Sequence, residues 1–192
     1  MTAALQWHDE PEEAFREWAL SALCGPGVSS TNRADVIADI VEAFVLPSSY
    51  QWAAFHEGWT MCDAVTPQQV ERIFACFTFD TLGTAHLARE EQAFFDNLPE
   101  VVEVFRGAPP DRKRGYAWTT DEAVAERFAR GHRGIPVRGG TIYRATIEKP
   151  RIWTVFTERG EAEIFSAPTS KESARIVSLQ RGDMEERDGC RH

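Results

Sequence analysis

Cysteine patterns that build disulfide frameworks or zinc sites are missing from this chain. Its four cysteines, Cys24, Cys62, Cys76 and Cys190, are scattered, with no Cys-x-x-Cys spacing and no paired histidines nearby. Because cytoplasmic thiols stay reduced, we expect free or buried thiols in a reducing cytoplasm rather than disulfides or a zinc site.

Several other signals are also absent. No stretch approaches the roughly 20 apolar residues that span a bilayer, and the first residues have an acidic flank without a basic segment, so we expect no membrane association and no secretory signal. His56-Glu57 has no second histidine four residues on, which removes the zinc-protease signature. The chain also has no Gly-x-Ser-x-Gly elbow, no Walker loop and no dinucleotide-binding glycine fingerprint.

Basic residues are scarce in the first half only. Residues 1–100 hold 16 Asp and Glu against four Lys and Arg, a net charge of −12, whereas residues 101–192 hold 14 acids against 17 bases, a net charge of +3. A change of this size predicts two functionally different halves. The basic half suits a phosphorylated ligand, and the acidic half would repel nucleic acid.

Helical periodicity runs through the first half of the chain. Thr66-Pro67-Gln68-Gln69 is the strongest start signal, because it combines a cap, a proline at the first helical position and a capping-box glutamine. The predicted helices begin near Asp9, Asn32, Tyr50, Thr66 and Thr84, and the last of them ends near Asn97.

The second half changes to short strands rich in β-branched residues. One helix, predicted to be capped by Thr120 or Asp121 and stopped by Gly131, interrupts these strands. Helices followed by strands predict an α+β protein with a helical lobe over 1–98, a core over 99–179 and a disordered tail over 180–192. The predicted strands are VVEVFRG, GYAWTT, GGTIYRATI, RIWTVF, EAEIF and ARIVSL.

Two acidic residues, Glu161 and Glu163, are the most informative chemical feature. Acids at positions i and i+2 of a strand point to the same face, where they can converge on one reacting group. An arginine such as Arg106 could hold an anionic substrate beside them, because its fork matches the geometry of a phosphate.

The order of these elements resembles the mono-ADP-ribosyltransferases of the arginine–serine–glutamate clade. This clade includes bacterial toxins, phage transferases and vertebrate ecto-transferases. The shared features are a strand ending in Arg106-Gly107, an aromatic and hydroxyl strand that runs into a helix with Phe128-Ala129, and a strand with Glu161-x-Glu163. The resemblance covers residues 99–179 and implies a mixed β-sandwich core of short strands with one intervening helix. It also implies that NAD is consumed as the substrate and that no metal is needed.

The resemblance assigns roles to the polar residues. Arg106 with Gly107 would bind the NAD phosphates or ribose, and Thr119, helped by Thr120, would support the pocket. Glu163 would be the invariant catalytic acid and would stabilise the oxocarbenium-like transition state formed when the nicotinamide–ribose bond breaks. Glu161 goes with arginine-directed transfer and would deprotonate the acceptor as a general base.

Aromatic residues complete the expected site. Tyr116, Trp118 or Phe128 could stack on nicotinamide, since aromatic rings bind flat heterocycles. The resemblance places a substrate-recognising turn at 154–160, with Phe156 as its aromatic residue and Arg159 beside it. Tyr116, Phe128 and Phe156 are equally consistent with packing roles, and Trp118 is by default a core residue.

Function and partners follow from the resemblance. It implies a cytoplasmic toxin or effector of bacterial or phage origin, or one delivered into the cytoplasm of a host cell, that acts on a protein acceptor or on a nucleic-acid base and has a cognate antitoxin. NAD hydrolysis is an alternative activity. One departure favours a non-catalytic binding or inhibitor protein instead: Ala117 stands where the family has the hydroxyl that positions the catalytic glutamate.

Overall fold

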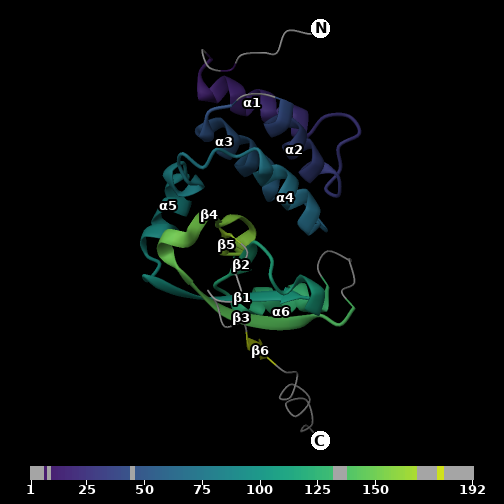
Figure 1. The fold of residues 1–192 in the computed structure, drawn as a ribbon, viewed down its shortest axis with the longest axis vertical. Helices are drawn as coiled ribbons and strands as arrows, with labels where there is room; N and C mark the ends of the chain where they lie inside the picture. The colour runs from purple at the N-terminus through teal and green to yellow at the C-terminus, as the bar shows by residue number, and fades with distance from the viewer. Residues whose placement is uncertain (1–6, 8–9, 44–45, 132–137, 168–176, 180–192) are drawn as a thin grey trace, which may run out of the picture. The chain divides into compact units, whose positions relative to one another are not determined.

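The protein was examined as a computed structural model, which describes residues 7, 10–43, 46–131, 138–167 and 177–179 (Figure 1). The chain forms two compact units. The first contains Met1–Asp96 and Trp153–Glu158, and the second contains Asn97–Ile152 and Arg159–His192. Each unit is described by itself.

The first unit is helical, as the sequence predicts. Thr66 begins one helix with a complete capping box, because its hydroxyl accepts from the Gln69 amide at 3.3 Å and the Gln69 side chain accepts from the Thr66 amide at 2.9 Å. In Figure 1 the first four helices lie next to one another. The helices are α1 Glu12–Leu23, α2 Arg33–Ala43, α3 Ser48–Trp59, α4 Pro67–Ala75 and α5 Arg89–Asp96.

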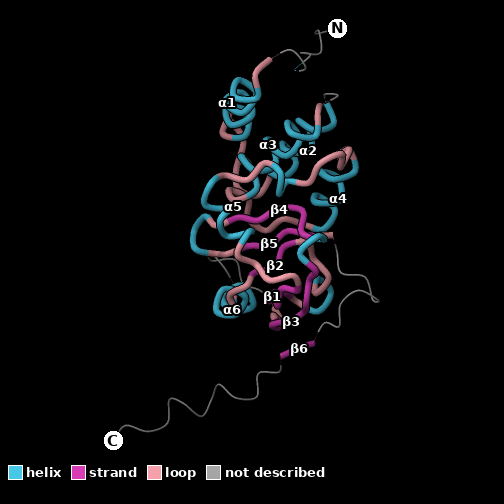
Figure 2. The backbone as a smooth tube through the Cα atoms, turned by 90° about the vertical axis from the view of Figure 1, so that its left-hand side faces the viewer, coloured by secondary structure: helices cyan, strands magenta, loops and turns pink. Residues whose placement is uncertain are grey.

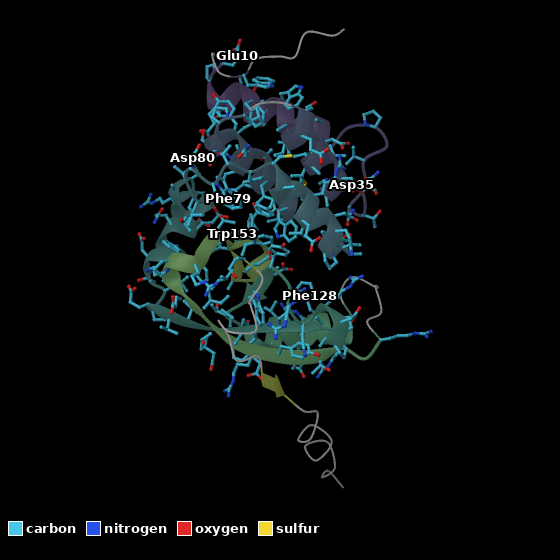
Figure 3. All side chains as sticks on the ribbon, in the orientation of Figure 1. Glu10, Asp35, Phe79, Asp80, Phe128 and Trp153 are labelled. Carbon is cyan, nitrogen blue, oxygen red and sulfur yellow. The ribbon has the colours of Figure 1, made fainter. Side chains whose placement is uncertain are left out.

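Aromatic rings fill the core of the first unit. Trp52 is fully buried on α3, and its ring lies 4.8 Å from that of Phe77. Strand β4, Ile152–Phe156, contributes residues to the same core from far along the sequence. The Trp153 ring lies 4.8 Å from Phe79 (Figure 3), and the Phe156 ring lies 5.9 Å from Phe55. The segment 153–158 therefore belongs to the first compact unit.

The second unit is built on an antiparallel sheet. Its strands pair in the order β5-β2-β1-β3-β6. Helix α6, Glu122–Arg130, packs on β1 and β3 (Figure 2), and Asp121 caps it by accepting from the Ala123 amide at 2.8 Å. The strands are β1 Val101–Ala108, β2 Ala117–Thr119, β3 Thr141–Glu148, β5 Glu163–Ser166 and β6 Val177–Leu179.

Two glycines let α6 approach the sheet closely. A β-carbon at Gly107 would lie 1.9 Å from the Ala125 carbonyl oxygen, and one at Gly140 would lie 1.9 Å from the Ala129 carbonyl oxygen. Both neighbours are backbone atoms, which cannot rotate away as a side chain can. Gly107 is therefore required for packing in this structure, and its predicted part in binding NAD stays a prediction.

The α+β class is confirmed, while several details differ from the sequence prediction. The described strands of the second unit form one sheet, where a sandwich was expected. The helix expected from Thr84 begins only at Arg89, after a short 3-10 turn at Gly83–Ala85. The tail 180–192 lies outside the described residues.

Candidate functional site

Strand pairing brings three of the predicted site segments together. Strand β2 lies between β1 and β5, so Thr119 faces Phe105 on one side and Glu163 on the other. Directly opposed residues of antiparallel strands lie within about 5.5 Å of each other at their Cα atoms. Arg106 follows Phe105, and Glu161 precedes β5 by two residues. The sheet thus brings the segments that carry Arg106, Thr119 and the two acids next to one another.

The Arg106 side chain turns inward onto the loop that joins β1 to β2. Its Nε donates to the Arg112 carbonyl oxygen at 3.1 Å, and its Nη1 donates to the Ala117 carbonyl oxygen. A β-carbon at Gly115 would lie 2.2 Å from the guanidinium carbon of Arg106, so glycine leaves the room that the guanidinium occupies. Two of the nitrogen atoms of this arginine are therefore engaged by backbone.

The electrostatic setting of Arg106 is unusual for an arginine. Burial of the guanidinium lowers its pKa to about 10, while the Glu163 carboxylate raises the pKa and the Arg112 charge lowers it. Arg106 remains charged at neutral pH, since its pKa stays well above 7. The Glu163 carboxylate thus acts on the charge of the half-buried Arg106, so the acid and the cation of the predicted site influence each other electrostatically.

Thr119 ties the end of β2 to the segment that carries the acids. Its hydroxyl donates to the Glu161 carbonyl oxygen at 2.6 Å and accepts from the Asp121 amide at 3.1 Å. The Thr120 amide adds a hydrogen bond to the Ala162 carbonyl oxygen at 3.2 Å. The Thr119 hydroxyl, two residues after Ala117 and two residues before the Asp121 cap of α6, therefore supports the backbone of the acidic segment.

The two acids do not lie on one regular strand, contrary to the prediction. Strand β5 begins at Glu163, and Ala162 has a φ of 43°, in the left-handed region that non-glycine residues seldom adopt. This bend breaks the alternation that would place Glu161 and Glu163 on the same face. Such strain at a non-glycine residue persists where surrounding contacts hold it and is common at functional sites. Both acids are half-buried.

The three aromatic residues predicted to stack on nicotinamide differ in how much of each side chain is exposed to solvent. Trp118 is only 2% exposed, and its Nε1 donates to the Gly115 carbonyl oxygen at 3.0 Å, so it is a core residue in this structure. The half-buried Tyr116 ring stacks on Phe165 with centroids 5.8 Å apart. Phe128 lies on α6 (Figure 3), and its side chain is half-buried. Tyr116 and Phe128 are the two candidates with exposed ring surface.

Phe156 does not lie in a recognition turn. It is 2% exposed, ends β4 and packs against Phe55 and His56 inside the first unit. The prediction that it contacts substrate is wrong for this arrangement, because hydrophobic burial holds the ring in a core. Arg159 lies in the turn Glu158–Gly160, and its side chain lies outside the described residues.

Sequence reasoning missed three residues that shape the site. Gly115 makes room for the Arg106 guanidinium, Ala162 bends the acidic segment, and Arg112 accepts a hydrogen bond through its carbonyl oxygen and places its charge near Arg106. The glycine alone had a signal in the sequence, since it follows three basic residues at a strand start. The other two depend on tertiary contacts.

Comparisons with protein-family models, with curated proteins and with solved structures gave no match. Within the described ranges, no group of three His, Cys, Asp or Glu side chains is placed to hold a metal ion. A separate search of the same residues found no helix with the length and apolar character needed to cross a membrane.

Proposed function

We propose that the second unit is an NAD-dependent mono-ADP-ribosyltransferase. The observation that supports this most is the pairing of β1, β2 and β5, which gathers Arg106, Thr119 and Glu163 from segments far apart in the sequence. The action of the Glu163 charge on the Arg106 guanidinium is a second support. Both features fit a site in which the cationic side binds an anionic nucleotide. On the other side, Glu163 would stabilise the positive charge that develops on the ribose.

Glu163 is the catalytic residue of this proposal. Breaking the nicotinamide–ribose bond develops positive charge on the ribose, and a carboxylate held at the start of a strand stabilises that charge without rearrangement. Glu161 acts on the acceptor: it removes a proton from the attacking nitrogen or oxygen, which then forms the new bond to the ribose carbon as nicotinamide leaves. NAD supplies the ADP-ribose, and no oxidant or reductant is required.

The division of roles between the acids gives a direct test. We expect Glu161→Gln to lower the transfer of ADP-ribose to an acceptor far more than it lowers NAD hydrolysis, because water needs no positioned base on the acceptor side. The measurement compares labelled ADP-ribose on protein with free nicotinamide. Equal loss of both activities would argue against the general-base role. Mass spectrometry of targets labelled from tagged NAD identifies the acceptor.

A second candidate is a non-catalytic binding protein on the same scaffold. The observation that favours it is the commitment of the Thr119 hydroxyl to the Glu161 backbone, together with Ala117, which has no hydroxyl to offer to a carboxylate. Purified protein incubated with NAD and with cell lysate discriminates the two. Free nicotinamide above the level of a protein-free control supports the transferase, and none under any condition supports the binder.

A further inference from the structure

The loop from Pro109 to Tyr116 is held from its inner side. Arg106 binds the carbonyl oxygens of Arg112 and Ala117, and Trp118 Nε1 binds that of Gly115. A turn from the Arg112 amide to the Pro109 carbonyl oxygen, at 2.9 Å, closes the loop at its start. All of these hydrogen bonds are accepted by backbone carbonyl groups. They therefore hold the backbone of the loop in place without engaging its basic side chains.

The outer side of this loop is basic. Arg112 and Lys113 are exposed and Arg114 is half-buried, against one exposed acid, Asp111. The positive charge of Arg112 repels that of the half-buried Arg106 and lowers the pKa of Arg106. An anion bound at Arg112 relieves this repulsion, and arginine and lysine side chains are the usual ligands of phosphate groups.

We propose that Arg106 is a positioning residue for the loop 109–116, and that Arg112 and Lys113 on this loop bind the diphosphate of the nucleotide. The diphosphate assignment rests on the proposed function. This division differs from the expectation that Arg106 itself grips the phosphates, because two of its nitrogens are already engaged by backbone carbonyl groups. The buried arginine shapes the loop, and the exposed cations of that loop meet the ligand.

The positioning role is tested by limited trypsin digestion, which does not depend on NAD. Trypsin needs an extended backbone, so we expect it to cleave after Arg112, Lys113 and Arg114 only when the loop detaches from the hydrogen bonds that Arg106 and Trp118 donate. We expect cleavage there to increase by about tenfold, equivalent to about 1.4 kcal/mol of lost anchoring, in both Arg106→Lys and Gly115→Ala. The lysine loses the fork, and the added methyl group displaces the guanidinium.

Two controls keep this digestion decisive. Arg144→Lys, on β3, alters an exposed arginine 3.7 Å from Glu103 and should leave cleavage unchanged. Gly115→Ala retains Arg106, so it carries the test if Arg106→Lys does not fold. Wild-type cleavage rates in the folded variants would overturn the positioning role.

The anion site is tested by calorimetric titration with inorganic pyrophosphate and then with NAD. We expect the double variant Arg112→Ala, Lys113→Ala to bind pyrophosphate about tenfold more weakly. The matched control removes two exposed cations of α6 by Arg127→Ala and Arg130→Ala and should bind within about twofold of wild type. Equal losses in both variants, or no pyrophosphate binding by wild type, would overturn the site. Pyrophosphate binding that needs Arg112 and Lys113, without any nicotinamide release, would leave this site standing and refute the transferase.

Discussion

The two units bury their polar groups in different ways. In the first unit buried side chains pair with neutral groups: Trp52 Nε1 and Ser48 Oγ both donate to the Thr81 carbonyl oxygen, at 2.9 and 3.1 Å, and Nε2 of the half-buried His56 lies 2.7 Å from Thr154 Oγ1. The second unit also buries neutral groups, Thr119 and Ser166, but it adds the half-buried Arg106, a charged group whose desolvation lowers its pKa to about 10. Neutral pairs stabilise a fold at low cost, whereas a buried charge is costly and tends to mark a functional site.

The two cores also differ in how easily they accommodate an added methyl group. Substitution of one glycine in each unit by alanine tests this difference. Gly107→Ala sets a new methyl group against backbone atoms of α6, and we expect a loss of about 3 kcal/mol in the free energy of unfolding. Gly58→Ala, in the first unit, meets side-chain atoms of the buried Ile37, with Cδ1 at 2.7 Å and Cγ1 at 2.8 Å, and because side chains can shift where backbone cannot, we expect a smaller loss of about 1 kcal/mol. Urea unfolding of both variants measures the difference. A larger loss at Gly58 would reverse the comparison.

Acid should weaken the first unit through His56. Burial lowers the pKa of His56 to about 3, with the positive charges of Arg16 and His86 adding to the effect. The pKa of His56 in the unfolded chain is about 6.5, so below that pH the unfolded chain takes up a proton that the folded protein does not. The free energy of unfolding is therefore highest above pH 6.5 and decreases as the pH falls toward 3. We expect a loss of almost 3 kcal/mol in the free energy of unfolding by pH 4.5, at about 1.4 kcal/mol for each pH unit.

The measurement is urea unfolding at pH 7.5, 5.5 and 4.5. His56→Gln should show a weaker dependence on pH over this range, because it cannot take up the proton on unfolding. His86→Gln removes one of the charges that add to the lowering of the His56 pKa, so it should weaken the pH dependence only slightly and much less than His56→Gln does. The same dependence in His56→Gln as in wild type would remove His56 as the cause.

A smaller effect is expected at Thr119. Thr119→Val keeps the shape but removes the donor to the Glu161 carbonyl oxygen, which should cost about 1 kcal/mol of unfolding free energy. Thr119→Ser retains the hydroxyl and should restore most of the nicotinamide release that the valine variant loses. If both variants release nicotinamide at the wild-type rate, the hydrogen bond from Thr119 to the Glu161 backbone does not contribute to the activity of the two acids.

Local signals predicted local structure well. The Thr66 capping box and the Asp121 cap follow from neighbouring residues, and both are present. The return of Trp153–Glu158 to the helical unit could not be predicted, because it depends on packing of Trp153 against Phe74 and of Phe156 against Phe55, 79 and 101 positions away. Strand periodicity could not distinguish one sheet from two, since alternation is the same in both.

The candidate site was predictable in composition but not in geometry. The residue types of Arg106, Thr119 and Glu163 and their order along the chain indicated a shared site, and the strand register gathers these segments. The left-handed bend at Ala162 had no signal, because alanine seldom adopts it. The inward turn of Arg106 likewise depends on the space left by Gly115.

Nicotinamide release by Glu163→Gln tests the central claim most directly. We expect this variant to bind NAD like wild type in calorimetric titration but to release nicotinamide about a hundredfold to a thousandfold more slowly, since the carboxylate acts on charge that develops only in the transition state. Glu103→Gln, an exposed acid on β1, should keep the wild-type rate. Wild-type release by Glu163→Gln would contradict the account.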